Sequence, residues 1–159
     1  MRAVALRLYA SPDRRAFRAL FGDPEVMRYA GDGMAIDRVA ADALFDKVLR
    51  LPESDPAFYV WAVVESGEYA GHAELKRRAG RSEYELVYFL QPTRWGRGLG
   101  GRVVDLLLAE ARRLALPFVI ATVERRNAAS LRILSKRGFS IDLPLSRELN
   151  ADCYRLDLT

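Results

Sequence analysis

The sequence is organised around one glycine-rich stretch, Gln91-Pro92-Thr93-Arg94-Trp95-Gly96-Arg97-Gly98-Leu99-Gly100-Gly101-Arg102. The apolar run 86–90 precedes it, and the helical pattern 103–108 follows it. This order predicts a strand, then a glycine turn, then a helix. Glycines at a helix N-terminus bring backbone N–H groups together, and such a cluster binds anions. The stretch therefore predicts an anion site, without saying which anion it holds.

Other glycine-rich turns fit the sequence less well. A P-loop needs Lys followed by Ser or Thr after its glycines, whereas Arg102 and Val103 follow here. A Rossmann turn belongs to the first unit of a parallel sheet, whereas a predicted β-hairpin precedes this turn. A glycine-rich connection with no ligand remains an alternative that this stretch alone leaves open.

Length and composition indicate one globular domain, residues 1–159. The formal net charge is +4, and the positive charge is almost all arginine and is spread along the chain. This spread argues against a nucleic-acid partner, while the planar arginine fork suits phosphate groups. Cys153 is the only cysteine, so no internal disulfide forms and a cytoplasmic location is expected. No apolar run approaches the roughly 20 residues of a membrane helix, so we expect no membrane partner.

The pattern along the chain predicts an α+β fold with a mixed, mostly antiparallel central sheet and flanking helices. Strands are predicted over 3–9, 58–64, 69–76, 83–90, 118–123, from 139 onward, and 153–158. Helices are predicted over 11–21 with Ser11 as N-cap, over 24–29, after Asp37, over 103–114 and over 127–136, with a loop at 142–151. Alternate residues of strand 83–90 share a face: Tyr84, Leu86, Tyr88 and Leu90 on one, Glu83, Glu85, Val87 and Phe89 on the other.

A second stretch, residues 123–139, carries Asn127, then Ser130, and ends in Lys136-Arg137-Gly138-Phe139. With the glycine turn and the segment 23–29, it resembles the GNAT superfamily of acetyl-CoA-dependent N-acetyltransferases. Gly98 and Gly100 match the two small positions of the family's pyrophosphate turn. Trp95 stands where Gln or Arg is usual, a variant similar to the branch of ribosomal-protein N-terminal alanine and serine acetyltransferases.

The resemblance implies acetyl-CoA as cosubstrate, with no metal. It also implies that the strands 83–90 and 118–123, the fourth and fifth, splay apart around the pantetheine arm. Backbone N–H groups of the fourth strand would face the oxyanion, and three arginines of the turn would neutralise phosphates. The implied cofactor-binding residues are Tyr88, Phe89, Leu90, Arg94, Trp95, Gly96, Arg97, Gly98, Gly100, Gly101, Arg102, Asn127 and Ser130.

Acetyl transfer to an amine needs a base, because an amine is protonated at neutral pH. Glu85 is the candidate, with an exposed strand glutamate as the alternative and Glu74 as a second, weaker candidate. Ser130 is the candidate partner of the leaving thiolate, since Leu134 stands where many family members carry a tyrosine. A serine that bonds to its own helical turn is the alternative.

The acceptor is expected to meet Tyr29 and Trp61 as well as Glu85, although Trp61 also fits a core position. His72 and Cys153 are predicted to have no catalytic role. The predicted function is direct acetyl transfer to a primary amine, either a peptide or protein N-terminus or a small molecule. The alternative is a non-catalytic CoA-binding sensor or interaction module. A homodimer is compatible with the resemblance.

Overall fold

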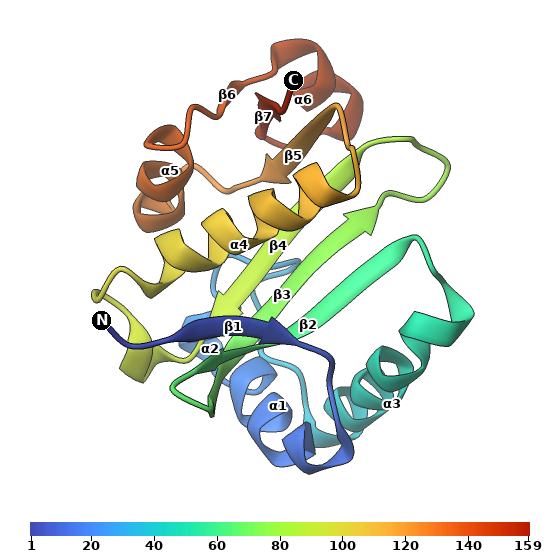
Figure 1. The fold of residues 1–159 in the computed structure, drawn as a ribbon, viewed down its shortest axis with the longest axis vertical. Helices are drawn as coiled ribbons and strands as arrows, with labels where there is room; N and C mark the ends of the chain where they lie inside the picture. The colour runs from blue at the N-terminus through green and yellow to red at the C-terminus, as the bar shows by residue number, and fades with distance from the viewer.

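The computed structural model describes residues 1–159, whose seven strands form one sheet in the order β1-β2-β3-β4-β5-β7-β6 (Figure 1). The strands are β1 Val4–Arg7, β2 Phe58–Glu65, β3 Glu68–Arg77, β4 Tyr84–Leu90, β5 Phe118–Thr122, β6 Ser140–Ile141 and β7 Cys153–Asp157. The helices are α1 Arg14–Phe21, α2 Pro24–Met27, α3 Arg38–Ser54, α4 Leu99–Arg113, α5 Ala128–Ser135 and α6 Leu143–Leu149. Short 3₁₀ turns lie at η1 Ser11–Asp13 and η2 Pro92–Arg94.

The sheet is antiparallel except at its centre, where β4 and β5 run parallel. These two strands share one register pair, Glu85 with Ile120, and then diverge. The predicted α+β class and the splaying of the fourth and fifth strands are both confirmed. The divergence leaves the carboxyl end of β4 without a strand partner on its β5 side.

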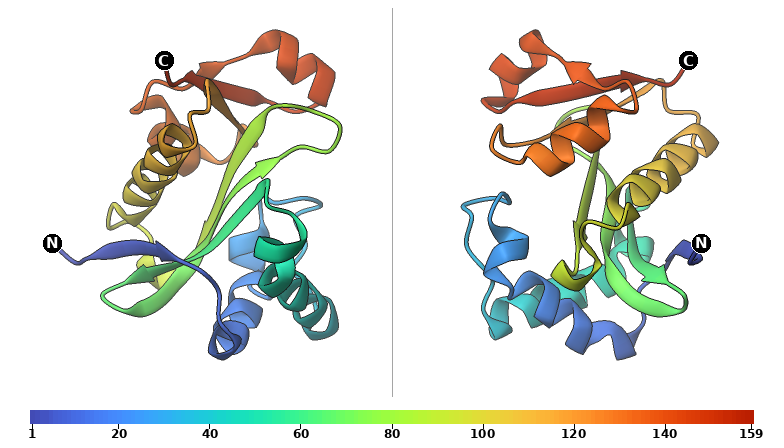
Figure 2. Two further views of the ribbon diagram at one scale, coloured as in Figure 1. Left: turned by 45° about the vertical axis from the view of Figure 1, so that its right-hand side comes forward. Right: turned by 90° about the vertical axis from the view of Figure 1, so that its left-hand side faces the viewer.

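Two helical layers cover opposite faces of the sheet, with α4 on one side and α1 to α3 on the other (Figure 2). One face of α4 is buried: Val103, Val104, Leu107 and Ala111 are completely inaccessible to solvent. They pack in one cluster with alternate residues of β3 and β4. Phe89 points to the other face, where it joins an aromatic cluster from α1 and α3. The predicted alternation along β4 is therefore correct.

Four local predictions are corrected by the structure. The segment predicted as a loop, 142–151, contains α6, whose first turn is capped by the Asp142 carboxylate accepting the Leu145 N–H at 3.0 Å. Ser11 is the first residue of η1 and is not an N-cap. The carboxylate of Asp13 accepts the N–H of Ala10 at 2.9 Å. The helix after Asp37 continues through a proline to Ser54, and the helix that begins at Pro24 ends early, at Met27.

Candidate active site

The glycine turn between β4 and α4 contains two residues with left-handed backbone angles. Gly96 has φ 71° and Gly98 has φ 78°, values that favour glycine because other residues are strained there. Gly98 is the N-cap of α4, and its carbonyl accepts the first helical hydrogen bond, from the Arg102 N–H. The N–H groups of residues 99–101 precede that bond and have no helical acceptor. The turn therefore has the donors of an anion site.

The other two glycines of the turn serve close packing. A Cβ placed on Gly100 would lie 2.9 Å from the Ile133 side chain, and one on Gly101 would lie 2.7 Å from the Arg137 guanidinium. Arg137 in turn donates to the Gly101 carbonyl at 2.6 Å and pairs with Asp105 on α4 at 2.7 Å. The small residues thus let α5 approach the start of α4.

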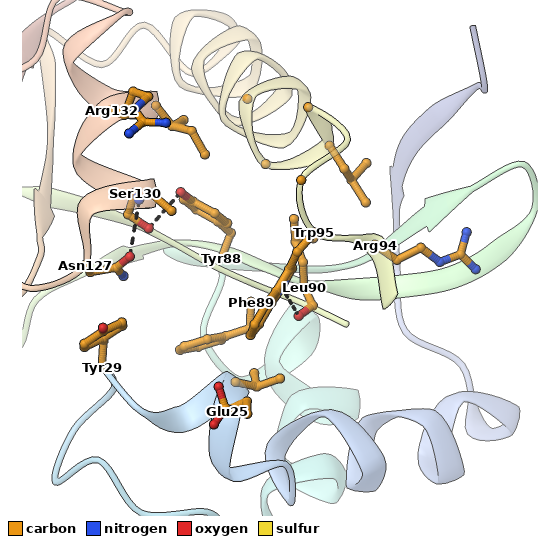
Figure 3. Close-up of a pocket in the computed structure, with 18 of the residues that line it drawn as sticks. Glu25, Tyr29, Tyr88, Phe89, Leu90, Arg94, Trp95, Asn127, Ser130 and Arg132 are labelled. Carbon is orange, nitrogen blue, oxygen red and sulfur yellow. Dashed lines mark hydrogen bonds between the residues drawn. The ribbon is translucent and has the colours of Figure 1, made fainter. Parts of the chain in front are cut away.

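A cavity of about 750 Å³ lies between the end of β4, the glycine turn, α5 and α2 (Figure 3). A second cavity of about 220 Å³ lies beside it, toward the β4–β5 divergence. The two cavities share the lining residues Tyr29, Tyr88, Phe89, Asn127 and Ser130. A long ligand bound in the larger cavity and a smaller ligand bound in the second cavity would therefore meet at these residues.

Two hydroxyl groups meet where the cavities join. The Tyr88 hydroxyl from β4 and the Ser130 hydroxyl from α5 lie 3.1 Å apart and point toward each other (Figure 3). The Asn127 side-chain oxygen accepts the Ser130 N–H at 3.3 Å, which caps α5. Burial raises the pKa of the Tyr88 hydroxyl, against a smaller lowering by its hydrogen bond with Ser130. The phenol is therefore protonated at neutral pH and can donate.

The aromatic residue of the turn is fixed to the end of β4. The Trp95 indole N–H donates to the Leu90 carbonyl at 2.9 Å, and the ring lines the larger cavity (Figure 3). The same bond holds the turn against the strand. This places Trp95, Gly96, Gly98 and the strand end at one wall of the larger cavity.

The arginines expected at the phosphates are directed elsewhere. Arg94 is one of the residues that line the larger cavity, but its guanidinium pairs with Glu65 at 2.7 Å and Glu68 at 2.8 Å, and it points away from the cavity (Figure 3). Arg97 donates to the carbonyl of Thr93 at 2.8 Å. Neither Arg97 nor Arg102 lines either of these two cavities. The sequence could not show this, because Glu65 lies 29 residues from Arg94 along the chain.

Four cations that the sequence analysis missed line the larger cavity, and two of them, Arg28 and Arg137, pair with Glu25 and Asp105. Arg132 and Lys136 on or just after α5 are exposed and form no ion pair with a carboxylate. They lie two and six residues after Ser130, and Ala129, Arg132, Ile133 and Lys136 all line the cavity. Their spacing of three and four residues is the signal that could have identified this helix face.

Of the three residues predicted to meet the acceptor, Glu85 and Tyr29 line the smaller cavity and Trp61 does not. Glu85 lines the smaller cavity with its side chain 6% exposed; Arg78 donates to one of its oxygens at 2.8 Å and the Thr122 hydroxyl to the other. Tyr29, just after α2, lines both cavities. Trp61 lies on the opposite face, packed against the α4-side core and stacked on Tyr59. The structure does not bring Trp61 to the site, because β2 alternation turns it toward α4.

The remaining weaker candidates also have defined places. Cys153 is buried in a small cluster with Ile120 and Leu145. Glu74 lies on β3 in register with Val87 of β4, on the face covered by α1 to α3.

No group of three or more His, Cys, Asp or Glu side chains is arranged to hold a metal ion. The helices are all too short or too polar to cross a bilayer.

The fold and the site together define a class of protein. A mixed sheet diverges at its centre, a glycine turn supplies an anion cradle, and a long cavity passes between the two, as acyl-CoA-dependent transferases require. Residues 4–140 match the acetyltransferase (GNAT) domain, and the chain belongs to this family. The family prediction made from the two motifs is confirmed.

Three individual relatives show how the chain compares within the family. The L-methionine sulfoximine/L-methionine sulfone acetyltransferase of Salmonella typhimurium is 36% identical over 61 residues, which span 38% of this chain and 36% of that protein. The match therefore spans about a third of that relative. The structure of yncA from Salmonella typhimurium with its cofactor acetyl-CoA has a TM-score of 0.74 at 18% identity, covering 99% of this chain and 95% of its own. The ribosomal L7/L12 alpha-N-protein acetyltransferase RimL in complex with coenzyme A has a TM-score of 0.76 at 13% identity, covering 97% and 93%.

Proposed function

We propose that this protein is an acetyl-CoA-dependent N-acetyltransferase that transfers the acetyl group directly to a primary amine. The supporting observation is the junction of the two cavities at the Tyr88–Ser130 hydroxyl pair. One cavity leads from this pair to the glycine turn, and the other leads to the buried carboxylate of Glu85. Family membership supports acetyl transfer, and the predicted cosubstrate is the one bound in the yncA structure.

The cosubstrate would enter through the larger cavity. Its pyrophosphate would accept the N–H groups of residues 99–101, and Arg132 and Lys136 would supply the positive charge first expected from three arginines of the turn. The pantetheine arm would pass Asn127 and lie between the diverging β4 and β5. We include a cytoplasmic location in this proposal, because a chain with a single cysteine forms no internal disulfide.

The chemistry at the junction needs an oxyanion site and a proton donor. The amine nitrogen forms a bond to the thioester carbon, and the backbone N–H groups of residues 88–90 stabilise the resulting oxyanion. The carbon–sulfur bond then breaks, and the sulfur takes a proton through the Ser130 or Tyr88 hydroxyl. That hydroxyl regains its proton from the nitrogen that becomes the amide. A base must first remove one proton from the ammonium form, and Glu85 and Glu74 are the two candidates.

The acceptor class is narrowed by the smaller cavity. Its volume of about 220 Å³ suits a single amino-acid-sized group bearing a primary amine. This favours an N-terminal residue of a peptide, in line with RimL, or a free amino-acid derivative, in line with the Salmonella sulfoximine and sulfone acetyltransferase. Longer acceptors would extend past Tyr29 into solvent.

Calorimetric titration with acetyl-CoA, followed by a mass-spectrometric acetylation screen, tests this proposal. The screen would use peptides that begin with Ala or Ser, L-methionine sulfone and spermidine. We expect acetyl-CoA binding, acetylation of at least one amine, and a large loss of kcat with Ser130→Ala. Arg132→Gln should raise the KM for acetyl-CoA about tenfold. The matched change Arg126→Gln, outside both cavities, should not. Absence of binding at millimolar acetyl-CoA would contradict the proposal.

A CoA-binding module without catalysis is the second candidate. Leu134, which replaces the tyrosine that many family members carry, is the observation in its favour. The Tyr88 hydroxyl lies within hydrogen-bond distance of Ser130 and can fill that role from another element. Acetyl-CoA binding without thioester loss across the whole amine panel would favour the module.

A further inference from the structure

A chain of polar side chains crosses the aromatic core on the face covered by α1 to α3. The Tyr69 hydroxyl lies 3.0 Å from the Tyr9 hydroxyl, and the Tyr9 hydroxyl lies 2.8 Å from Nδ1 of His72. Nε2 of His72 lies 2.7 Å from one oxygen of Glu74. His72 is 1% exposed, and the rings of Phe17, Phe21 and Phe89 surround it. The chain thus runs from two half-buried tyrosines through the buried His72 to Glu74.

Counting donors and acceptors sets the direction of this chain. An ionised Glu74 only accepts, so Nε2 of His72 carries the proton that it receives. Nδ1 is then bare and accepts from Tyr9, whose oxygen accepts from Tyr69. With His72 protonated on Nε2 alone, this arrangement gives each of the four groups a hydrogen-bond partner. Every hydrogen therefore points toward Glu74.

Glu74 differs from Glu85 in what its oxygens contact. Both oxygens of Glu85 are engaged, by the Arg78 guanidinium and by the Thr122 hydroxyl. Glu74 uses one oxygen for His72, while its other oxygen has only the Lys76 ammonium at 3.6 Å, beyond a good hydrogen bond. The side chain of Glu74 is 15% exposed, so it is not sealed in the core. It is the freer acceptor of a proton.

The position of Glu74 relates it to the acceptor cavity. Its register partner Val87 lines the smaller cavity, and so does Lys76, which follows on the same face of β3. Side chains directly opposite on neighbouring antiparallel strands have Cβ atoms roughly 5 Å apart. An amine bound over Val87 is therefore within reach of Glu74, directly or through one water molecule.

We infer that Glu74, held by the Tyr69–Tyr9–His72 chain, takes the proton from the acceptor ammonium, and that His72 and Tyr9 are positioning residues. The inference rests on the proposed acetyl transfer. The ammonium gives one proton to the free oxygen of Glu74, which later passes it to solvent. The neutral amine then attacks the thioester, a second nitrogen proton ends on the thiolate, and the third stays on the amide. The chain holds the other oxygen of Glu74 throughout.

The charge on Glu74 is set by competing surroundings. Burial raises its pKa, the hydrogen bond from His72 and the smaller effect of Lys76 lower it, and the net pKa lies below the usual value. Beyond these neighbours, Arg7 and Asp13 near the Tyr9 end pair with each other at 2.7 Å, and Arg78 pairs with Glu85 across on β4. Loss of the His72 donor would leave burial dominant and raise the pKa of Glu74.

The first experiment needs no acceptor, because His72 is the only histidine. Protein labelled with ¹⁵N-histidine gives one imidazole signal set by NMR. We expect a neutral ring with Nε2 protonated and Nδ1 bare at pH 7, and a shift of the Nδ1 resonance in Tyr9→Phe, which removes its donor. A ring protonated on Nδ1 alone, or on both nitrogens at pH 7, would overturn the directed chain.

The second experiment uses the amine found in the acetylation screen, at saturating acetyl-CoA. Glu74→Gln should lower kcat about 100-fold, and Glu85→Gln should lower it less. His72→Leu should move the acid limb of kcat upward by about one pH unit. His72→Gln, whose amide N–H still donates to Glu74, should restore most of that shift. Acetyl-CoA binding and the circular dichroism spectrum serve as folding controls for each variant.

Two outcomes would overturn the inference while leaving acetyl transfer intact. One is full turnover of Glu74→Gln with a large loss in Glu85→Gln. The other is an unchanged acid limb in a folded His72→Leu variant. Absence of acetylation by the wild-type protein would instead contradict the proposed function, and the NMR result would still decide the structure of the chain.

Discussion

The two faces of β3 are built from alternate residues of one strand, yet their chemistry differs. Toward α4 the strand presents Ala73 and Leu75, both fully buried in an entirely apolar cluster. Toward α1 to α3 it presents His72 and Glu74, whose polar chain passes through an aromatic core. Both faces are well packed, and no buried side-chain nitrogen or oxygen lacks a partner. The two faces therefore differ in the polarity of the side chains that they bury, while the buried polar atoms of both faces have hydrogen-bond partners.

This difference separates scaffold from site. Apolar burial stabilises a fold by about 25 cal/mol per Å², whereas buried polar groups recover their desolvation cost only if every partner is present. An apolar face would hold α1 to α3 at least as well as the polar chain does. The chain is thus explained by what happens at its Glu74 end, next to the acceptor cavity. Four substitutions test this distinction.

Leu107→Ala should have the largest effect on stability, lowering the free energy of unfolding by about 3 kcal/mol. Leu107 is completely buried on the α4 side, and its loss leaves a cavity that rigid neighbours fill only partly. Urea denaturation measures the change, and Val39→Ala, at an 81% exposed position, is the control with an effect within about 0.5 kcal/mol. The pH profile of kcat should not move. A profile shift would show that the α4 face also tunes the site.

His72→Leu should destabilise the fold by about 1–3 kcal/mol, because it removes a donor from a largely buried carboxylate. Since that change raises the pKa of Glu74, the folded form binds more protons than the unfolded form. The deficit should therefore be larger at pH 7 and should shrink as the pH falls through 4, where Glu74 of the variant becomes protonated in the unfolded state as well. The double variant His72→Leu, Glu74→Leu should recover the lost stability but not the activity. If the double variant is less stable than His72→Leu alone, the Tyr69–Tyr9–His72 chain serves the stability of the fold rather than the site.

Tyr69→Phe should have a smaller effect, about 1 kcal/mol or less of unfolding free energy. It removes the far end of the chain, and the Tyr9 hydroxyl still donates to Nδ1 of His72. Turnover at neutral pH should change less than in Tyr9→Phe, measured on the same amine. A loss equal to that of Tyr9→Phe would mean that the hydroxyls act as one unit.

Trp61→Phe should have the smallest effect on function. Trp61 was expected at the acceptor site, but it faces α4 and stacks on Tyr59 with ring centroids 6.1 Å apart. The KM for the amine should stay unchanged while thermal stability falls modestly. A raised KM for the amine would place Trp61 near the acceptor and break the separation of the two faces.

Local patterns predicted much of the cofactor side, because its parts are close together in the sequence. The glycine turn follows β4 directly and starts α4, so its backbone conformation and free N–H groups depend on neighbouring residues. Asn127 and Ser130 are three residues apart, and one caps the other's N–H. The α6 helix was missed although Asp142 and Pro144 carried its start signal.

Side-chain partners from distant segments were not predictable in this way. Arg94 was expected at a phosphate, but Glu65 and Glu68 from the β2–β3 hairpin bind its guanidinium. The sequence indicates only an ordinary strand residue at His72, because its hydrogen-bond partner Tyr9 lies 63 residues away along the chain. A local pattern contains no information about which charges meet across a sheet.

The sequence by itself determined the family, most of the strands and helices, the glycine turn and the Asn127–Ser130 helix start, because each depends on residues adjacent along the chain. The tertiary structure alone decided which cations line the cavity, that Tyr88 meets Ser130, and that Glu74 ends a directed hydrogen-bond chain. The reason is physical: hydrogen bonds and ion pairs act over about 3 Å, and only the folded sheet brings these distant residues that close.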